Sequence, residues 1–224
     1  MKADQGNGRM TQEMAGTKLA LILAAGELFA ETGLDGTSVR AIAEKGGANI
    51  AAVNYHFGSK ENLYTEVLRH VIQECECHGA RQALEDETHF ATPERKAALL
   101  RDLVRERFTS YFSPNRPQWY GRLVIRSMLD PTPSLETVVK QLMFPEHDAL
   151  VQVFQRINPA LTADAARLWA FSLIGQIGFY VFGESVILMV LNARRYTADF
   201  MDAAADHVSR MMIAAMGLPP LAEH

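Results

Sequence analysis

The sequence predicts an all-α protein in which a small three-helix domain is followed by a larger helical bundle. Apolar residues recur at steps of three and four along most of the 224 residues, the spacing that gathers them on one face of an α-helix. No segment alternates apolar and polar residues between hairpin turns, and no repeat of fixed length is visible. Hydrophobic residues make up 48% of the chain, enough for a sizeable core. We expect about nine or ten helices.

The first helix follows an apolar stripe that starts near Thr17 and should end at Gly33, since glycine often follows the last helical turn. A short second helix should end at the pair Gly46 and Gly47, and a short third helix should end at the sequence FGS that starts at Phe57. The residues that can cap the second, third and fourth helices are Thr37, Asn49 and Ser59.

Helical spacing continues beyond residue 90. Pro145 should kink or interrupt a helix near Phe144, because proline lacks the backbone N–H that an inner helical turn uses. Gly217, followed by two prolines, should end the last helix. Hydroxyl residues placed to begin the helices of this part are Thr92, Ser134, Thr162 and Thr197.

These patterns divide the chain into four parts. Residues 1–15 are polar and contain no apolar stretch, so we expect a flexible arm and no secretory signal. Residues 16–62 should form the small domain, residues 63–218 the bundle, and residues 219–224 a tail.

The formal net charge of −4 shows no global basic surplus, so any nucleic-acid binding must rest on local features. One such feature is a small basic excess between Gly36 and Lys60. Cys75 and Cys77 would point to different faces of a helix, so we expect no disulfide and a reducing, cytoplasmic location. Together with His78 they could bind a metal ion, but a second ligand cluster is missing from the sequence. We expect neither a metal nor a cofactor.

Residues 169–191 are apolar and long enough to cross a membrane. However, they include Gln176, Glu184 and three glycines, and no clear positive-inside pattern flanks them. We therefore expect a helix that is buried in the bundle or in a dimer, and no membrane contact.

Two short helices joined by the sequence GGA have the outline of a helix-turn-helix, in which the turn favours a glycine with a positive φ angle. We assign that position to Gly47. Gly46 should let the two helices approach each other closely. The alternative interpretation is an ordinary helical hairpin whose polar rings are merely exposed.

A helical wheel gives the third helix, at about residues 49–56, two faces. Val53, Ile50 and Phe57 share an apolar arc, and Asn54 lies at its edge. The residues of the opposite arc are Ala51, Ala52, Tyr55 and His56. Its alanines would let the backbone sit deep in a DNA major groove, and its rings could hydrogen-bond to phosphates or base edges. Ile50 and Asn54 could face either the groove or the core.

The sequence LILAAGELFAETGLDGTSVRAIAEKGGANIAAVNYHFGSKENLY resembles the N-terminal DNA-binding domain of the TetR (tetracycline-repressor) family of bacterial transcriptional regulators. The run RLVIRSMLDPTPSLETVVKQLMFPEHDAL is similar to the C-terminal domain of the CecR-type branch of that family. This resemblance implies a homodimer with a DNA-binding head and a larger helical body that binds a small molecule.

The resemblance and the wheel together give the expected contacts to double-stranded operator DNA. They are Thr37, Ser38, Arg40, Asn49, Ile50, Ala51, Ala52, Asn54, Tyr55, His56 and Lys60. Ile50 stands where many family members carry a lysine or another polar residue, and Ala52 where many carry a small hydroxyl residue. Base recognition would therefore involve fewer hydrogen bonds here.

In the body, Gln176, Tyr180 and Glu184 are spaced by four residues and should share one face of a helix. A few polar groups in an apolar lining are typical of a small-molecule site. Glu184 could instead pair with Arg126 or Arg194. The residues that we expect around a largely apolar inducer are Arg126, His147, Trp169, Gln176, Tyr180 and Glu184.

Small and apolar residues in the last two long helices indicate a two-fold interface. They are Ser172, Gly175, Gly178, Val208, Met211, Met212 and Ala215. We therefore expect a homodimeric repressor that a small-molecule inducer releases from a palindromic operator. The alternatives are a regulator that activates or needs no ligand, and an enzyme or scaffold with a degenerate head. No catalytic motif supports an enzyme.

Overall fold

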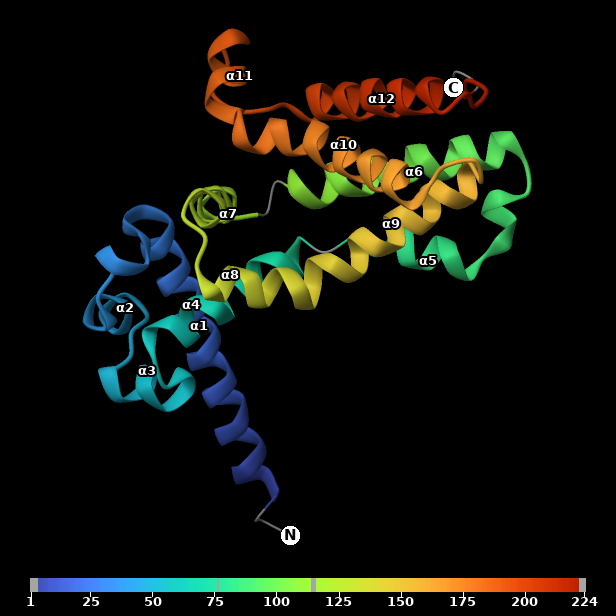
Figure 1. Cartoon of the computed structure of the whole chain (residues 1–224). Helices are drawn as coiled ribbons and strands as arrows, with labels where there is room; N and C mark the ends of the chain where they lie inside the picture. Colours follow the sequence, from blue (N-terminus) through green and yellow to red (C-terminus); the bar gives the residue numbers. More distant parts are fainter. Residues whose placement is uncertain (1–3, 76, 114–115, 222–224) are drawn as a thin grey trace. The chain divides into compact units, whose positions relative to one another are not determined.

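The computed structural model of the chain describes residues 4–75, 77–113 and 116–221, with side chains from residue 15 onward. Every regular element in these ranges is a helix, which confirms the all-α class. The chain divides into two compact units (Figure 1). Unit 1 consists of Met1–Glu74 and Pro117–Leu142, and unit 2 consists of Cys75–Arg116 and Met143–His224.

Unit 1 contains the predicted small domain and three further helices that pack on it. Its helices are α1 (Asp4–Gly36), α2 (Val39–Lys45), α3 (Ile50–Phe57), α4 (Lys60–Glu74), α7 (Trp119–Leu129) and α8 (Pro133–Val138). Helices α4 and α7 both pack against α1, and α8 packs against α4. This packing unit is therefore larger than the domain expected over residues 16–62.

The core of unit 1 is apolar and continuous along α1 and α4. Leu21 and Phe29 of α1 are fully buried, as are Leu63 and Val67 of α4. The rings of Phe29 and Tyr64 meet edge to face, with centroids 5.0 Å apart. Such aromatic contacts add to the stabilisation that apolar burial provides.

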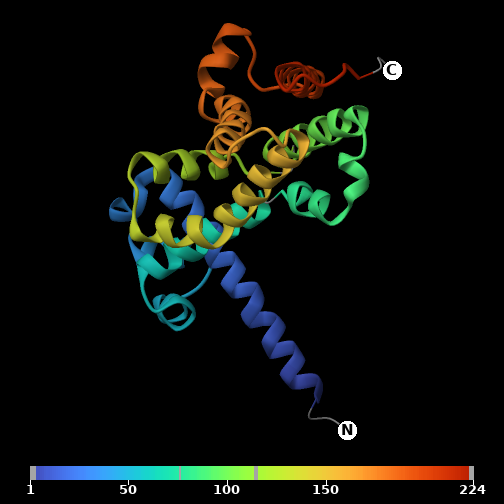
Figure 2. The same cartoon turned by 45° about the vertical axis from the view of Figure 1, so that its right-hand side comes forward.

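Helix α1 differs from the prediction at its N-terminus and agrees with it near its C-terminus. Residues 4–15, expected as a flexible arm, continue the helix from Asp4 and project away from the rest of unit 1 (Figure 2). Extending an existing helix costs far less than starting one, which explains why the apolar stripe underestimated the length of this helix. At Gly33 the backbone leaves the helical conformation (φ 78°, ψ 177°), at the predicted end.

Unit 2 is a bundle around α6, α9, α10 and α12. Its helices are α5 (Gly79–Glu85), the 3₁₀ turn η1 (Glu87–Phe90), α6 (Pro93–Tyr111), α9 (Phe144–Ile157), α10 (Ala163–Phe182), α11 (Glu184–Val190) and α12 (Ala198–Ala215). Helix α6 packs against α12, and α9 packs against α5 and α10. Its core includes Leu100, Phe154, Leu173 and Ile177.

Most predicted helix starts are confirmed by side-chain caps, and two are corrected. Asn49, Ser59, Thr92, Thr162 and Thr197 accept a hydrogen bond from the third residue that follows. Ser38 caps α2 instead of Thr37, and Thr132 caps α8 instead of Ser134. Ser134 is buried one residue after Pro133.

The described residues form more helices than the nine or ten expected. One added break lies at Gly183, which separates α10 from α11. Another lies before Pro145, where the π-helical turn η2 (Val139–Met143) connects α8 to α9. Proline has no backbone N–H to donate, and its ring clashes with the carbonyl four residues earlier in an α-helix, so the wider π turn accommodates it. The predicted interruption near Phe144 is therefore confirmed. Gly217 has a φ of 69° and follows the end of α12, also as predicted.

Candidate nucleic-acid interface

The turn between α2 and α3 depends on both of its glycines. Gly47 has a φ of 65°, in the left-handed region that glycine adopts without steric cost. A Cβ on Gly46 would lie 2.9 Å from Cδ2 of Leu21 in α1, so this position allows close packing. The N–H of Ala48 donates to the carbonyl of Ala43 at 2.9 Å and closes the turn. Both glycine assignments are confirmed.

Each helix of the pair starts at a polar cap. Oγ of Ser38 accepts from the N–H of Ala41 at 3.1 Å, and Oδ1 of Asn49 accepts from the N–H of Ala52 at 2.8 Å. These bonds satisfy backbone donors that a helix leaves unpaired in its first turn. Since Asn49 uses only its oxygen, its side-chain NH₂ stays available as a donor.

Helix α3 buries two side chains and exposes a stripe of four. Val53 and Phe57 are buried in the core of unit 1. The exposed residues, called the α3 face below, are Ile50, Ala51, Asn54 and Tyr55. Tyr55 is 73% exposed and Ile50 is 46% exposed. Residues at steps of one, four and five lie together on a helix, so the α3 face is continuous.

This face is rotated relative to the one expected from the wheel. Ala52 and His56, expected to be fully exposed, are half-buried, whereas Ile50 and Asn54 lie on the exposed side. Ile50 shares the angular sector of Val53, but it starts the helix. Helix α3 packs mainly against α2 and α4, and this packing leaves Ile50 in the first turn 46% exposed. The wheel has no information about position along the axis.

Thr37 does not present its hydroxyl to solvent. Its side chain is 4% exposed, and its Oγ1 donates to the carbonyl of Gly33 at 2.7 Å and lies 2.8 Å from Oγ1 of Thr32. A phosphate contact through this hydroxyl, as expected from the sequence, would require the hydroxyl to leave these bonds. Thr37 instead fixes the connection between α1 and α2.

Lys60 serves the same connection. Its Nζ donates to the carbonyl of Leu34 at 2.8 Å and to that of Thr37 at 3.1 Å. An ammonium group has three donors, so one N–H of this half-buried side chain is left for another acceptor.

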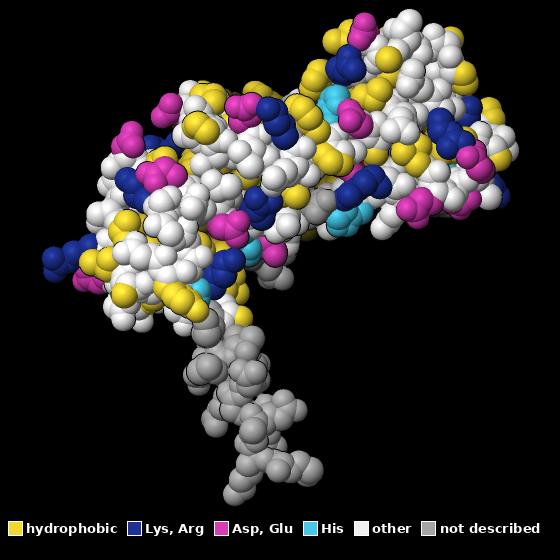
Figure 3. Space-filling view, turned by 60° about the horizontal axis from the view of Figure 1, so that its bottom comes forward, with side chains coloured by type: hydrophobic (Ala, Val, Ile, Leu, Met, Phe, Trp, Pro, Cys, Tyr) yellow, Lys and Arg dark blue, Asp and Glu magenta, His cyan; other side chains and the backbone are white. Residues whose placement is uncertain are grey.

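The local basic excess is partly neutralised. Lys45 pairs with Glu27 at 2.7 Å, whereas the exposed Arg40 has no ion-pair partner within the described ranges. Basic and acidic side chains are interspersed over the face shown in Figure 3, where no continuous basic field is visible. The α3 face itself is uncharged.

The six expected ligand residues are divided between the two units. Arg126 lies in unit 1, where it donates to the carbonyl of Glu31 at 3.2 Å, and the remaining five lie in unit 2. Glu184 is exposed at the start of α11, beyond the break at Gly183, so it lies on a different helix from Gln176 and Tyr180.

The unit 2 candidates have separate surroundings. The ring of Tyr180 packs between Phe108 and Phe200. The ring of His147 lies 4.6 Å from that of Phe171, and Trp169 borders a hollow of about 220 Å³ on α10. Oε1 of Gln176 is buried and has no hydrogen-bond partner among the described residues.

An apolar stripe on α10 remains uncovered in the single chain. Leu168, Phe171, Phe179 and Phe182 are 66%, 54%, 59% and 49% exposed. They follow one face at steps of three and four, together with the exposed Gly175. Of the other residues expected at an interface, Ser172, Met211 and Ala215 are exposed, and Gly178, Val208 and Met212 are buried. By length and composition alone, α10 also meets the criteria for a membrane span.

The cysteine segment has no metal-site geometry. No group of three or more His, Cys, Asp or Glu side chains within the described ranges could hold an ion, and Glu76 lies outside those ranges. Cys75 and Cys77 are not joined by a disulfide. Burial raises the pKa of the Cys77 thiol to about 11, so it is protonated at neutral pH.

Two family models match the chain. The model of bacterial regulatory proteins of the tetR family matches residues 21–67. The model of the C-terminal domain of the HTH-type transcriptional dual regulator CecR matches residues 97–216. The chain is 29% identical to CecR of Shigella flexneri over 187 residues, which cover 82% of this chain and 83% of that protein.

Solved structures support the same fold. A transcriptional regulator from Rhodococcus sp. Rha1 aligns with a TM-score of 0.62 at 19% identity, over 91% of this chain and 99% of its own. NalD, the secondary repressor of the MexAB-OprM multidrug efflux pump in Pseudomonas aeruginosa, aligns with a TM-score of 0.58 at 20% identity, over 90% and 96%. Since the CecR model spans more than half of the chain, the protein belongs to the TetR family of DNA-binding transcriptional regulators, in the group with a CecR-type C-terminal domain.

Proposed function

We propose that the protein acts as a homodimeric repressor in which the α3 face of each subunit enters a major groove of a palindromic operator, and that a small molecule releases it. The observation that carries the proposal is the α3 face. It presents an exposed tyrosine and an asparagine beside an alanine, on a helix anchored by Val53 and Phe57. Small residues beside donors allow close approach to base edges.

The residues of α3 would have different tasks at the DNA. Asn54 can hydrogen-bond to an adenine edge, and Tyr55 can donate to a base or a phosphate. Ile50 and Ala51 would contact thymine methyl groups. The NH₂ of Asn49 would reach a phosphate near the start of α3, while Ala52 and His56 would border the contact.

Phosphate binding would come from the start of α2 and from α4. Ser38 and Arg40 are exposed there, and helix N-termini favour anions. The remaining N–H of Lys60 could bind a third phosphate while its other donors hold the connection between α1 and α2. Thr37 would act only by supporting that connection.

The α10 stripe supports a two-fold interface. Four large apolar side chains on one face would each lose solvent contact against a second copy, and Gly175 would allow the helices to approach closely. This assignment accounts for the apolar character of α10 without a membrane. Binding to operator DNA places the protein in the cytoplasm.

Gln176 supports a ligand in unit 2. Its Oε1 is buried without a hydrogen-bond partner among the described residues, which is costly unless another donor reaches it. A largely apolar molecule carrying one donor would suit this position on α10. A coupling of about 1 to 3 kcal/mol between ligand and operator would suffice for a switch.

The test is fluorescence anisotropy with DNA from upstream of the protein's own gene. We expect Asn54→Ala and Tyr55→Ala to weaken specific binding by about 1 to 3 kcal/mol and to reduce discrimination against altered sites. Arg40→Gln should weaken binding to all DNA sequences alike, and should reduce the slope of the logarithm of the binding constant against the logarithm of the salt concentration by about 0.9. Arg210→Gln, which removes an exposed charge on α12, is the matched control. Unchanged affinity for both α3 variants would refute the assigned face.

A second candidate is a regulator that also activates. Its support is the similarity to CecR of Shigella flexneri, which is a transcriptional dual regulator. Reporter assays in cells with and without the gene would separate the two, because repression alone predicts only increased expression upon deletion. The matched relatives are transcriptional regulators, which supports a role without catalysis.

A further inference from the structure

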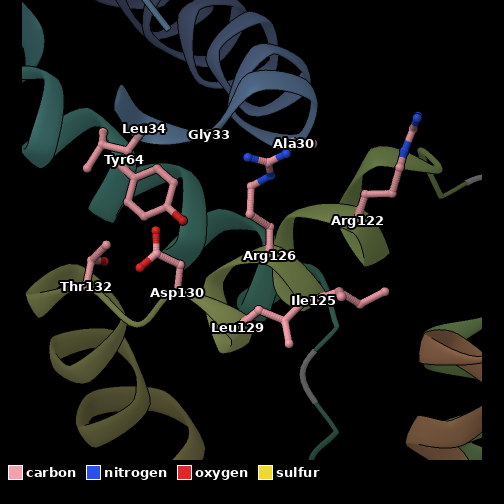
Figure 4. A pocket seen from close by; sticks show the side chains of 10 residues that line it. All are labelled: Ala30, Gly33, Leu34, Tyr64, Arg122, Ile125, Arg126, Leu129, Asp130 and Thr132. Carbon is pink, nitrogen blue, oxygen red and sulfur yellow. The ribbon is translucent and has the colours of Figure 1, made fainter. Parts of the chain in front are cut away.

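A cavity of about 480 Å³ lies entirely within unit 1, among helices that carry the DNA-binding motif (Figure 4). The end of α1, the middle of α4, helix α7 and the segment that follows it form its walls. Its volume lies in the range of small-molecule sites. None of the residues expected around an inducer, apart from Arg126, belongs to it.

Opposite charges stand on different sides of this cavity. The guanidinium group of Arg126 points towards Ala30 and Gly33, and the carboxylate of Asp130 points towards the hydroxyl of Tyr64 (Figure 4). Arg126 donates to the carbonyl of Glu31 and keeps further donors. The carboxylate of Asp130 has no hydrogen-bond or ion-pair partner among the described residues.

The Asp130 carboxylate is exposed and is free to accept hydrogen bonds from a ligand, and Arg126 lies one helical turn before it in the same lining. Tyr64 is 2% exposed as a residue, and burial raises the pKa of its phenol. The phenol is thus a neutral donor and acceptor at physiological pH. Arg122 also belongs to the lining, but its guanidinium points away from Asp130 (Figure 4).

Apolar groups cover the rest of the lining. Leu34 and Ile125 are half-buried, and Leu129 is 81% exposed at the end of α7. A leucine this exposed beside a cavity gains by covering an apolar group of a bound molecule. The site thus combines one acceptor, one strong donor and an apolar wall.

We propose that this cavity binds a small zwitterion with an apolar side group, whose ammonium meets Asp130 and Tyr64 and whose carboxylate meets Arg126. The charges of Arg126 and Asp130 cancel, so a ligand of zero net charge and opposite polarity fits better than a simple anion or cation. The consequence for regulation rests on the proposed function. Because α1 continues into the α2 connection and α4 follows α3, occupancy of this site would alter operator affinity.

The probes are three molecules that share a phenyl group: L-phenylalanine, phenethylamine and 3-phenylpropanoate. Ligand-observed NMR titration of the full chain should show the tightest binding for phenylalanine. We expect Asp130→Asn to weaken the binding of phenylalanine and phenethylamine about tenfold and to leave the affinity for 3-phenylpropanoate unchanged. Tyr64→Phe, which removes only the hydroxyl, should weaken the same two probes. Asp202→Asn on α12 is the matched control, since it changes an exposed aspartate outside the cavity.

Three results would overturn the proposal: no binding of any probe, equal affinity for all three, or phenylalanine binding that Asp130→Asn does not change. Asn replaces an exposed, unpartnered side chain of the same shape, and thermal unfolding will verify that the variant is folded. Operator binding without probes is measured in parallel. Operator binding in the absence of probe binding would reject only this inference, whereas loss of operator binding in the unaltered protein would reject the proposed function.

Discussion

Gly46 and Gly47 are adjacent in one turn, but substitutions there should fail for different reasons. Gly47 has a positive φ and no atom within 4 Å of an added Cβ, so Gly47→Ala should cost about 1 to 2 kcal/mol of stability from backbone strain alone. Gly47→Asn should cost less, since asparagine tolerates this conformation. Gly46→Ala should destabilise by displacing Leu21. Urea unfolding of the three variants measures this, and equal losses for Ala and Asn at residue 47 would contradict the strain argument.

His147 should make stability depend on pH. Burial lowers its pKa below the ordinary value of 6.5; Arg167 adds to this effect and Asp148 opposes it. The folded protein then binds a proton less readily than the unfolded chain, so the free energy of unfolding should fall as pH drops through about 6.5. His147→Gln should reduce that loss between about pH 7.5 and 5.5, measured by urea unfolding. His207→Gln changes an exposed histidine and should leave the loss of stability at low pH unchanged.

Individual residues show where sequence reasoning succeeds and where it fails. Gly47 and Asn49 were assigned correctly because a positive φ and an N-cap are local requirements. Ile50 was placed with the core because a wheel records angle but not whether a neighbour reaches that turn. Thr37 was assigned to the helix cap and to DNA, yet its bonds to Gly33 and Thr32 depend on the bend of α1.

The contact between α1 and α7 has a single crowded point. A Cβ on Gly26 would lie 2.2 Å from Cη2 of Trp119, and the indole is buried. Gly26→Ala should therefore force the helices apart or turn the ring, at a cost of about 1 to 3 kcal/mol. Since Trp119→Phe makes room for the methyl group that Gly26→Ala adds, the losses caused by the two substitutions in urea unfolding should be less than additive. Additive losses would show that the clash is relaxed elsewhere. Ala24→Gly, in the same helix, is a control for helix propensity.

Helix boundaries were predictable where a side chain or a proline imposes them. Thr92, Thr162 and Thr197 cap the N-termini of their helices as expected. The π turn before Pro145 lies where the helix was expected to be interrupted. The break at Gly183 was missed, because an apolar run on both sides preserves the helical pattern. Consequently Glu184 was grouped with Gln176 and Tyr180, although it belongs to the next helix.

At the scale of the molecule, the α10 stripe should control assembly. Phe179→Glu introduces a charge where the proposed interface would exclude water, so we expect a monomer by light scattering and a large loss of operator affinity. Met128→Glu alters an exposed apolar residue of α7 and should leave the dimer intact. A dimeric Phe179→Glu variant with normal affinity would place the interface elsewhere.

The composition of the two units could not be predicted from local patterns. Periodicity identifies helices but does not say that α7 and α8, distant in sequence, pack with α1 and α4. The head was therefore expected to end near residue 62. No pattern in the sequence indicated the cavity that α7 helps to form. Only the apolar face of α7 and the glycine at residue 26 indicate a close helix contact, and neither shows which helix lies on the other side.

The chain passes between the units three times, after Glu74, Arg116 and Leu142. Unit 1 is therefore not one continuous segment, because residues 75–116 of unit 2 interrupt it. A hybrid regulator joined at residue 74 would place α1 and α4 against a foreign α7, with Gly26 facing a side chain that did not evolve beside it. Exchange of DNA specificity between relatives should be better tolerated when only α2 and α3 are replaced. Junctions at Thr37 and Ser59 leave the packing of α7 and α8 against α1 and α4 unchanged.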